Sequence, residues 1–352
     1  MKPGKAAAAE AVESAAPRAA LWRPLPWQSA LWLDLSSLLL QKRLPHALLL
    51  AGGAGIGKRW FARALIAYGL CEKPSGYACG QCRSCVQLAA GSHPDAALLS
   101  PDGHRGLAIS EQSWNEQGLA YWQPEEDRKR RDIAIDAARS LMSKLDLGSH
   151  YGRGRYTLIE PADSLNTSSV NALLKTIEEP PAGMQLLLVT ERPQALPATL
   201  RSRCQRIRFA TPDAEAAQAW MAAEGVRDAE ALAYAHGAPL RALALQADEG
   251  VVLRREWEGL WRALLAARKD PLEVAAAIDK ERLAEHLHWA QYWLGQQLRA
   301  QLDAPAAARE AYAQMLQDVI EAQRRAQGNA QPQLLMEALT TRCQRLARAA
   351  QL

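Results

Sequence analysis

The sequence has no long apolar run and no strong excess of charge of one sign. None of its apolar runs approaches the roughly 18 residues that a membrane-spanning helix needs. The first twenty residues are rich in Ala, but Glu10, Glu13, Pro17 and Arg18 interrupt them, so a secretory signal peptide is not expected. The formal net charge is only +4, which does not by itself indicate a dedicated nucleic-acid-binding protein. We therefore expect a folded cytoplasmic protein with no membrane segment.

Cysteine is scarce, yet four of the six cysteines lie close together in a C-x7-C-x2-C-x2-C pattern. These four are Cys71, Cys79, Cys82 and Cys85. In a reducing compartment such a group indicates metal ligands rather than disulfides. Four thiolates suit tetrahedral Zn²⁺ and leave no position for water, so the pattern predicts a structural Zn²⁺ site. Four free thiols and an iron–sulfur cluster are the alternatives, and Cys204 and Cys343 are expected to be buried apolar residues.

A glycine-rich loop at residues 52–59 fits the phosphate-binding pattern G-x-x-x-x-G-K-[ST] at every position but the last. Gly52, Gly57 and Lys58 match the residues that surround and neutralise a bound phosphate. Arg59 stands where the pattern has the hydroxyl that ligates Mg²⁺. The loop therefore keeps its phosphate-binding residues and lacks one ligand of the metal.

A second motif of nucleotide hydrolases has also changed. The apolar run Tyr156–Glu160 predicts a strand that ends in the carboxylate of Glu160. Pro161 follows, where a hydrolase of this type carries the acid that activates water. Proline has no side-chain base, so the two motifs together indicate a nucleotide-hydrolase scaffold kept for a purpose other than turnover.

Short apolar runs alternate with helical patterns through the first two hundred residues and predict a mostly parallel sheet with helices on both faces. The expected strands are Ala47–Ala51, Ala96–Leu99, Ile133–Ile135, Tyr156–Glu160 and Leu186–Thr190. Helical spacing covers Leu21–Leu44, Lys58–Leu70 and Asn171 to the stop at Pro180–Pro181. The polar stretch Pro101–Arg131 is expected to be a surface insertion, the alternative being that its basic cluster Arg128–Arg131 touches DNA or a partner.

From about Thr211 onward the pattern is helical. Residues 1–20 are expected to form a disordered tail, residues 21–210 the α/β domain, residues 211–250 a small helical domain and residues 251–352 a larger one. Four tryptophans at helical spacing are expected in a core or subunit interface; they are Trp257, Trp261, Trp289 and Trp293. Gly237–Arg241 begins a helix, and Arg241 is either a surface residue or one that faces a bound phosphate.

Ser202-Arg203-Cys204 follows the last predicted strand and a connection that contains two prolines. A short polar segment ending in arginine, at the rim of such a sheet, can place an arginine finger on a neighbour's γ-phosphate. A solvated surface arginine is the alternative for Arg203.

Taken in this order, the motifs resemble the family of delta prime subunits of the bacterial DNA polymerase III clamp loader. The segments that carry the resemblance are the glycine-rich loop, the four cysteines, Gly91–Asp95, Asn171–Pro181, Leu200–Cys204 and Gly237–Arg241. The similarity covers roughly residues 21–250 and is weaker toward the carboxyl terminus. It leaves the insertion at residues 101–131 unexplained.

The resemblance implies an AAA+ fold: a RecA-like domain (21–210) with a zinc module (71–85), a helical lid (211–250) and a helical collar (251–352) for oligomerisation. In this family the chain joins motor (gamma/tau) and delta subunits in a hetero-pentamer that loads the sliding clamp onto primed DNA during replication. The motor subunits hydrolyse ATP, and delta prime does not. A motor subunit has Thr, Asp and Glu where Arg59, Glu160 and Pro161 stand here. The family's Ser-Arg-Cys arginine, which acts in the adjacent ATP site, corresponds to Arg203.

Two other hypotheses stay open. The chain could itself be an AAA+ ATPase in which Lys58 holds phosphate and Glu160 holds Mg²⁺. Arg59 and Pro161 argue against hydrolysis, but the retained Gly57 and Lys58 keep ATP or ADP binding possible. It could also be a zinc-dependent nucleic-acid-binding module that uses Cys71–Cys85 for recognition, although no neighbouring cluster of basic and aromatic residues supports this.

Overall fold

The computed structural model describes residues 22–110, 132–145, 148–226, 230–247, 250–302, 305–326 and 330–352. The tail predicted over residues 1–20 and the basic cluster Arg128–Arg131 lie outside these residues. The chain divides into two compact units, Met1–Asp248 and Glu249–Leu352.

The first unit contains a six-stranded sheet with the order β3-β2-β4-β5-β1-β6. The strands are β1 (Ala47–Ala51), β2 (Ala96–Ser100), β3 (Gly103–Gly106), β4 (Arg155–Ile159), β5 (Met184–Thr190) and β6 (Gln205–Arg208). Every neighbouring pair is parallel except β2 and β3. The predicted mostly parallel α/β sheet is confirmed.

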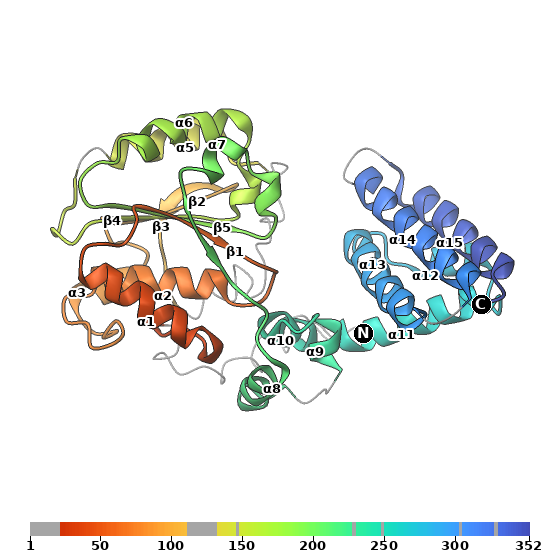
Figure 1. Cartoon of the computed structure of the whole chain (residues 1–352). Helices are drawn as coiled ribbons and strands as arrows, with labels where there is room; N and C mark the ends of the chain where they lie inside the picture. Colours follow the sequence, from red (N-terminus) through yellow and green to blue (C-terminus); the bar gives the residue numbers. More distant parts are fainter. Residues whose placement is uncertain are drawn as a thin grey trace, which may run out of the picture. The chain divides into compact units, whose positions relative to one another are not determined.

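Helices cover both faces of this sheet. They are α1 (Ser29–Leu40), α2 (Lys58–Leu70), α3 (Arg83–Ala89), α5 (Ile135–Leu145), α6 (Thr167–Glu178) and α7 (Ala198–Arg201), with short 3₁₀ turns at Pro26–Gln28, Ala162–Ser164 and Pro193–Ala195. In Figure 1, α1, α2 and α3 lie on one face of the sheet, and α5, α6 and α7 lie on the other.

The central strands bury both of their faces, and successive residues alternate between two hydrophobic cores. In β1, Leu48 and Leu50 pack into the core shared with α2, whereas Ala47 and Leu49 pack into the core shared with α6. Burial on both faces is what a parallel sheet between two helical layers requires. The all-apolar sequence of β1 follows from this placement.

Predictions made from local sequence patterns were wrong at three places. Ile133–Ile135 is not a strand: Ile133 forms only an isolated bridge with Leu165, and α5 begins at Ile135. The helix expected over Leu21–Leu44 is confined to α1. The stretch expected as an aperiodic insertion contains β3, which is held by antiparallel pairing with β2 rather than by its own sequence.

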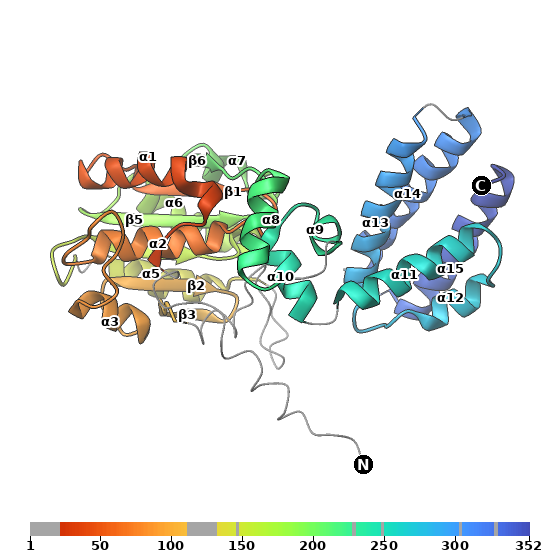
Figure 2. The same cartoon turned by 90° about the horizontal axis from the view of Figure 1, so that it is seen from below.

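A small group of helices completes the first unit: α8 (Ala214–Ala223), α9 (Ala231–Tyr234) and α10 (Pro239–Ala247). Figure 2 shows them beside one another at one end of the sheet. The ring of Trp220 on α8 meets the ring of Trp27 edge to face, with centroids 5.6 Å apart. This aromatic contact ties the helical group to the segment that precedes α1.

The described part of the second unit contains α11 (Gly250–Leu265), α12 (Pro271–Ala277), α13 (Leu283–Ala300), α14 (Ala306–Ala326) and α15 (Pro332–Ala349). Trp257 and Trp261 on α11 meet Trp289 and Trp293 on α13, and all four are buried. These tryptophans therefore form the core of this unit. Within the described residues, no helix combines the length and apolar character needed to cross a bilayer.

Two ionisable side chains are buried among these tryptophans. The guanidinium of Arg254 lies 4.7 Å from the ring centroid of Trp257 and 5.3 Å from that of Trp289, positions suited to cation–π attraction. His286 packs edge to face on Trp289. Burial is the main cause that lowers the pKa of His286 to about 4, and the nearby Arg282 lowers it further.

We expect acid to destabilise the chain through His286, because the unfolded state takes up a proton that the folded state excludes. From pH 7 to pH 5 this residue should lower the free energy of unfolding by about 2 kcal/mol. Urea-induced unfolding at both pH values should show a smaller difference for His286→Leu than for the wild type. His150→Gln, at an exposed histidine, should keep the full difference. Equal pH dependence in His286→Leu and the wild type would contradict the assignment.

Candidate functional site

The glycine-rich loop connects β1 to α2, as its motif requires. Gly57 has φ +91° and begins α2 from a left-handed conformation that favours glycine. The ammonium group of Lys58 donates a hydrogen bond to the carbonyl of Gly53 within the loop. The amide of Gln28 donates to the carbonyls of Ile56 and Gly57, at 3.1 and 3.0 Å. The loop is thus held by its own lysine and by the segment that precedes α1.

Lys58 is buried, with 4% of its surface exposed. Burial lowers the pKa of Lys58 to about 8, and the carboxylates of Glu191 and Asp163 oppose this shift. Asp163 is itself fixed, since it accepts hydrogen bonds from the Thr190 hydroxyl and from the backbone N–H groups of Glu191 and Arg192. Lys58 therefore already has anionic neighbours within the protein.

Helix α10 closes over the same loop. The backbone N–H of Leu240 donates to the carbonyl of Gly55 at 3.1 Å. Gly55 has φ +72°, and a Cβ atom at this position would lie 2.6 Å from the Cβ of Arg241. Only glycine allows this approach. The segment that the sequence singled out around Arg241 is therefore in direct contact with the loop.

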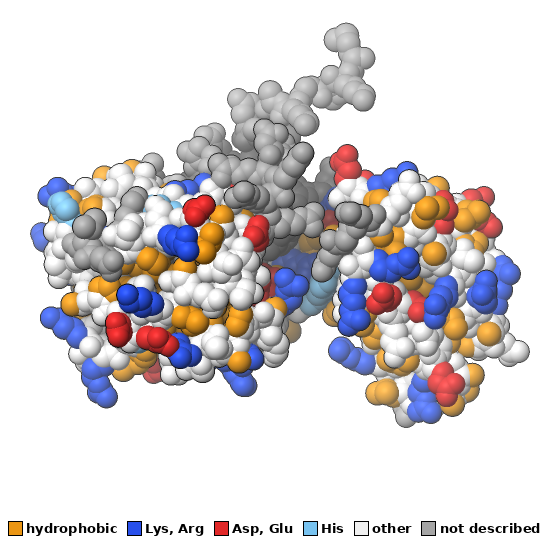
Figure 3. All heavy atoms as spheres, turned by 90° about the horizontal axis from the view of Figure 1, so that it is seen from above, with side chains coloured by type: hydrophobic (Ala, Val, Ile, Leu, Met, Phe, Trp, Pro, Cys, Tyr) orange, Lys and Arg blue, Asp and Glu red, His pale blue; other side chains and the backbone are white. Residues whose placement is uncertain are grey.

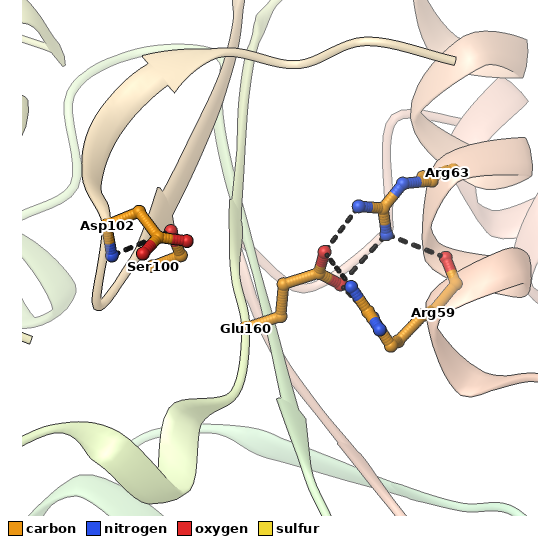
Figure 4. A network of polar contacts seen from close by, with 5 residues as sticks. All are labelled: Arg59, Arg63, Ser100, Asp102 and Glu160. Carbon is orange, nitrogen blue, oxygen red and sulfur yellow. Dashed lines mark hydrogen bonds and ion pairs between the residues drawn. The ribbon is translucent and has the colours of Figure 1, made fainter. Parts of the chain in front are cut away.

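The two altered motif positions meet in one buried ion cluster, which Figure 4 shows. Arg59 donates from Nε and Nη2 to the two carboxylate oxygens of Glu160, at 3.2 and 3.1 Å. Arg63, one turn further along α2, donates from Nη1 to Oε2 at 2.8 Å and from Nη2 to Oε1. Glu160 thus lies between two guanidinium groups.

This cluster is shielded from solvent, with Glu160 and Arg63 each 1% exposed and Arg59 7% exposed. Burial alone would raise the pKa of the Glu160 carboxyl, but the charges of Arg59 and Arg63 lower it to about 2. The carboxylate is therefore ionised at neutral pH, and both of its oxygens are engaged by arginine. Sequence reasoning identified Arg59 and Glu160 separately and missed Arg63. Its position four residues after Arg59, on the same side of the helix, was the available signal.

The four clustered cysteines converge between α2 and α3. Their sulfur atoms all lie within 4.8 Å of one another. Cys71 and Cys82 are 3.9 Å apart, and Cys79 and Cys85 are 4.0 Å apart. A tetrahedron with metal–sulfur bonds of 2.3 Å has edges of about 3.8 Å. The four sulfurs therefore fit a tetrahedral metal ion such as Zn²⁺.

Backbone N–H groups also point at these sulfurs. Cys79 donates to the sulfur of Cys71, and Cys82 donates to the sulfur of Cys79, both at 3.3 Å. Although burial opposes it, such hydrogen bonds lower the pKa of Cys79 to about 6. Thiolates are the metal-binding form of cysteine, so this environment suits a metal site. The other two cysteines, Cys204 and Cys343, are buried and free.

Arg203 follows α7 in the turn before β6 and lies at the surface of the first unit. Its Nε and Nη2 atoms are each 2.6 Å from Oε1 of Glu178, the last residue of α6. Nη1 donates to the carbonyl of Thr199 at 2.9 Å. The structure does not bring Arg203 together with the glycine-rich loop in any hydrogen bond or ion pair described for it.

Comparison with known proteins places these features in one family. The family model described as "DNA polymerase III, delta subunit" matches residues 27–213. The DNA polymerase III subunit delta prime of Escherichia coli is 32% identical over 251 residues, which cover 69% of this chain and 67% of the relative. The chain belongs to the DNA polymerase III delta prime family.

Other relatives include a second delta prime subunit and a tau subunit. The delta prime subunit of Pseudomonas aeruginosa is 36% identical over 228 residues, which cover 62% of this chain and 60% of that relative. The DNA polymerase III subunit tau of Salmonella typhimurium is 31% identical over 201 residues, covering 55% of this chain and 27% of the relative. The matched region thus spans about 60% of the length of the Pseudomonas protein.

We expect this member of the delta prime family to retain one metal ion per chain through purification. Cys85→Ser removes a buried ligand and should lower both metal content and melting temperature, because the ion would join α3 and the loop before it to the end of α2. Elemental analysis before and after treatment with a chelator measures this. Cys204→Ser, which changes a buried thiol outside the cluster, should keep the metal. Full metal content in Cys85→Ser would show that the cluster is not the binding site.

Proposed function

We propose that the chain is a non-hydrolysing clamp-loader subunit of the DNA polymerase III holoenzyme. In this proposal it works in the cytoplasm beside motor (gamma/tau) and delta subunits in a hetero-pentamer that places the sliding clamp on primed DNA. The observation that carries the proposal is the ion cluster of Arg59, Arg63 and Glu160. Family membership supplies the assembly in which such a chain has a use.

Hydrolysis of ATP at a phosphate-binding loop needs Mg²⁺, its protein ligands and a residue that orients the attacking water. Arg59 replaces the hydroxyl ligand, and Pro161 cannot act as a base. The carboxylate of Glu160 is occupied by two arginines, and only 1% of its residue surface is exposed. Placing Mg²⁺ there would require breaking a buried ion cluster, which is costly because it leaves uncompensated buried charges. This supports a subunit without turnover of its own.

This chain would contribute to ATP hydrolysis through Arg203, which would act in the ATP site of a neighbouring subunit. Its side chain is 38% exposed, which leaves the guanidinium accessible to a neighbouring subunit. As the bond to the γ-phosphoryl group breaks, its oxygens carry negative charge that an arginine stabilises. Arginine fingers raise rates by about 10³ to 10⁵. In this proposal Arg203 supplies one positive charge to the ATP site of an adjacent motor subunit.

The cysteine cluster would hold Zn²⁺ in a structural role, since four thiolates leave no open coordination position. The Trp32 indole N–H donates to the carbonyl of Gly76, and Trp22 packs close to Gly80. The module is thereby attached to the segment around α1.

We further propose that residues 21–210 form the RecA-like domain, residues 211–250 the lid and residues 251–352 the collar that mediates oligomerisation. The proposal gives the cysteine module a structural role and no part in reading nucleic acid. On the side of the first unit that carries α5 and α6, opposite α2 and α3, Lys and Arg side chains are interspersed with Asp and Glu (Figures 1 and 3).

We expect Arg203→Ala to lower DNA-stimulated ATP hydrolysis sharply in a clamp loader reconstituted from motor subunits, delta and this chain, because one ATP site loses its trans-acting charge. Gel filtration should show unchanged assembly. Arg201→Ala, which removes an exposed arginine two residues away, is the matched control and should have little effect. If Arg203→Ala assembles and hydrolyses ATP at the wild-type rate, Arg203 does not act as a finger.

A further inference from the structure

The guanidinium of Arg203 is already bound on one edge. Both Nε and Nη2 lie 2.6 Å from the same carboxylate oxygen of Glu178. On the opposite side, Nη1 donates to the carbonyl of Thr199 and lies 3.5 Å from the hydroxyl of Ser202. An exposed arginine usually samples many rotamers, whereas this one is restrained from two directions.

Both residues that restrain Arg203 belong to anchored elements. Glu178 ends α6, next to Ile177, which is buried in the core on that face of the sheet. Pro180 and Pro181 follow and prevent the helix from continuing. Thr199 lies on α7, which is fixed by Leu200, a side chain with no exposed surface. The backbone positions of Glu178 and Thr199 are therefore set by the fold.

A contribution to stability does not explain the pair. The Glu178 side chain is 48% exposed and that of Arg203 is 38% exposed. Ion pairs in such settings add little to stability, because water and salt screen them and two long side chains lose freedom. The pair does, however, decide which N–H groups of Arg203 face outward: Nε is used by the carboxylate, Nη1 donates to the Thr199 carbonyl, and Nη2 keeps one hydrogen directed away from the carboxylate.

We propose that Glu178 is a positioning residue that orients Arg203 for the γ-phosphate of the neighbouring subunit. This inference rests on the proposed function of Arg203. Glu178 holds the Nε edge, and the second hydrogen of Nη2 is left to donate to a phosphate oxygen. Because the rotamer is selected before the subunits meet, less freedom is lost when the ATP site is completed. Glu178 itself does not contact the nucleotide.

The test is DNA-stimulated ATP hydrolysis by the reconstituted complex with Glu178→Ala. The adjacent Glu179→Ala is the matched control, since Glu179 is an exposed glutamate at the same helix end. We expect Glu178→Ala to lower kcat about three- to tenfold, a range typical of coupled neighbours. KM for ATP and assembly should not change. Glu178→Gln keeps an acceptor oxygen and should restore part of the rate, and Glu179→Ala should match the wild type.

A double variant separates this inference from the proposed function. With Arg203→Ala in place, adding Glu178→Ala should have no further effect, because Glu178 acts only through Arg203. If Arg203→Ala lowers kcat but Glu178→Ala leaves it unchanged or raises it, the positioning role is wrong and the finger stands. If Arg203→Ala has no effect, both are wrong.

A measurement on the isolated chain checks the restraint without activity. The Nε–H proton of Arg203 should exchange slowly enough to be observed by NMR in the wild type and in Glu179→Ala. It should exchange rapidly in Glu178→Ala. Equal exchange in all three proteins would show that Glu178 does not hold Arg203 in solution.

Discussion

The buried cluster of Glu160 with Arg59 and Arg63 is the constraint on which the arrangement of the first unit depends. It joins the end of β4 to the first two turns of α2, directly behind the glycine-rich loop. The two guanidiniums supply the positive charge that a divalent metal supplies in a nucleotide hydrolase. A protein-derived counter-charge is permanent, whereas a metal arrives and leaves with nucleotide. In the proposed function, this cluster would hold β4 and α2 together whether or not nucleotide is bound.

The glycine-rich loop is likewise held by contacts from within the protein. Gln28 holds two loop carbonyls, Lys58 donates back into the loop, and Leu240 connects the loop to the small helical group. In many enzymes a lid closes over the active site when substrate binds and opens to release product. Here these contacts are made by the protein alone. A loop held by such contacts suits a subunit whose proposed task is to present Arg203 in a constant position.

How far the sequence predicts this structure depends on whether the signal is local. The run Ala47–Ala51 followed by the glycine-rich loop predicts β1 and α2, because an all-apolar run and the left-handed Gly57 act over a few residues. The cysteine cluster is predictable for the same reason. By contrast, β6 reads Gln205-Arg206-Ile207-Arg208 and is a strand because it pairs with β1, a contact that no local pattern encodes.

The candidate site was predictable only in part for the same physical reason. Arg59 and Glu160 are 101 residues apart. Sequence reasoning treated the first as a lost hydroxyl and the second as a carboxylate at a strand end, which only the rival ATPase hypothesis used as a Mg²⁺ ligand. Their pairing follows from their meeting in space. The partner of Arg203 was likewise hidden, because the sequence around Glu178 predicts a helix that stops at Pro180–Pro181 and gives no sign of a contact with Arg203.

The central claim is that charged groups of the protein itself occupy the positions that MgATP would need at the glycine-rich loop. The most direct test is a calorimetric titration of MgATP into the isolated chain, with a motor subunit titrated in parallel. We expect no saturable binding to this chain at nucleotide concentrations that saturate the motor subunit, because Glu160 is not available to Mg²⁺ and Lys58 is already held. Magnesium-dependent, one-to-one binding of ATP to this chain would contradict the central claim. It would mean that the buried ion cluster opens to admit nucleotide.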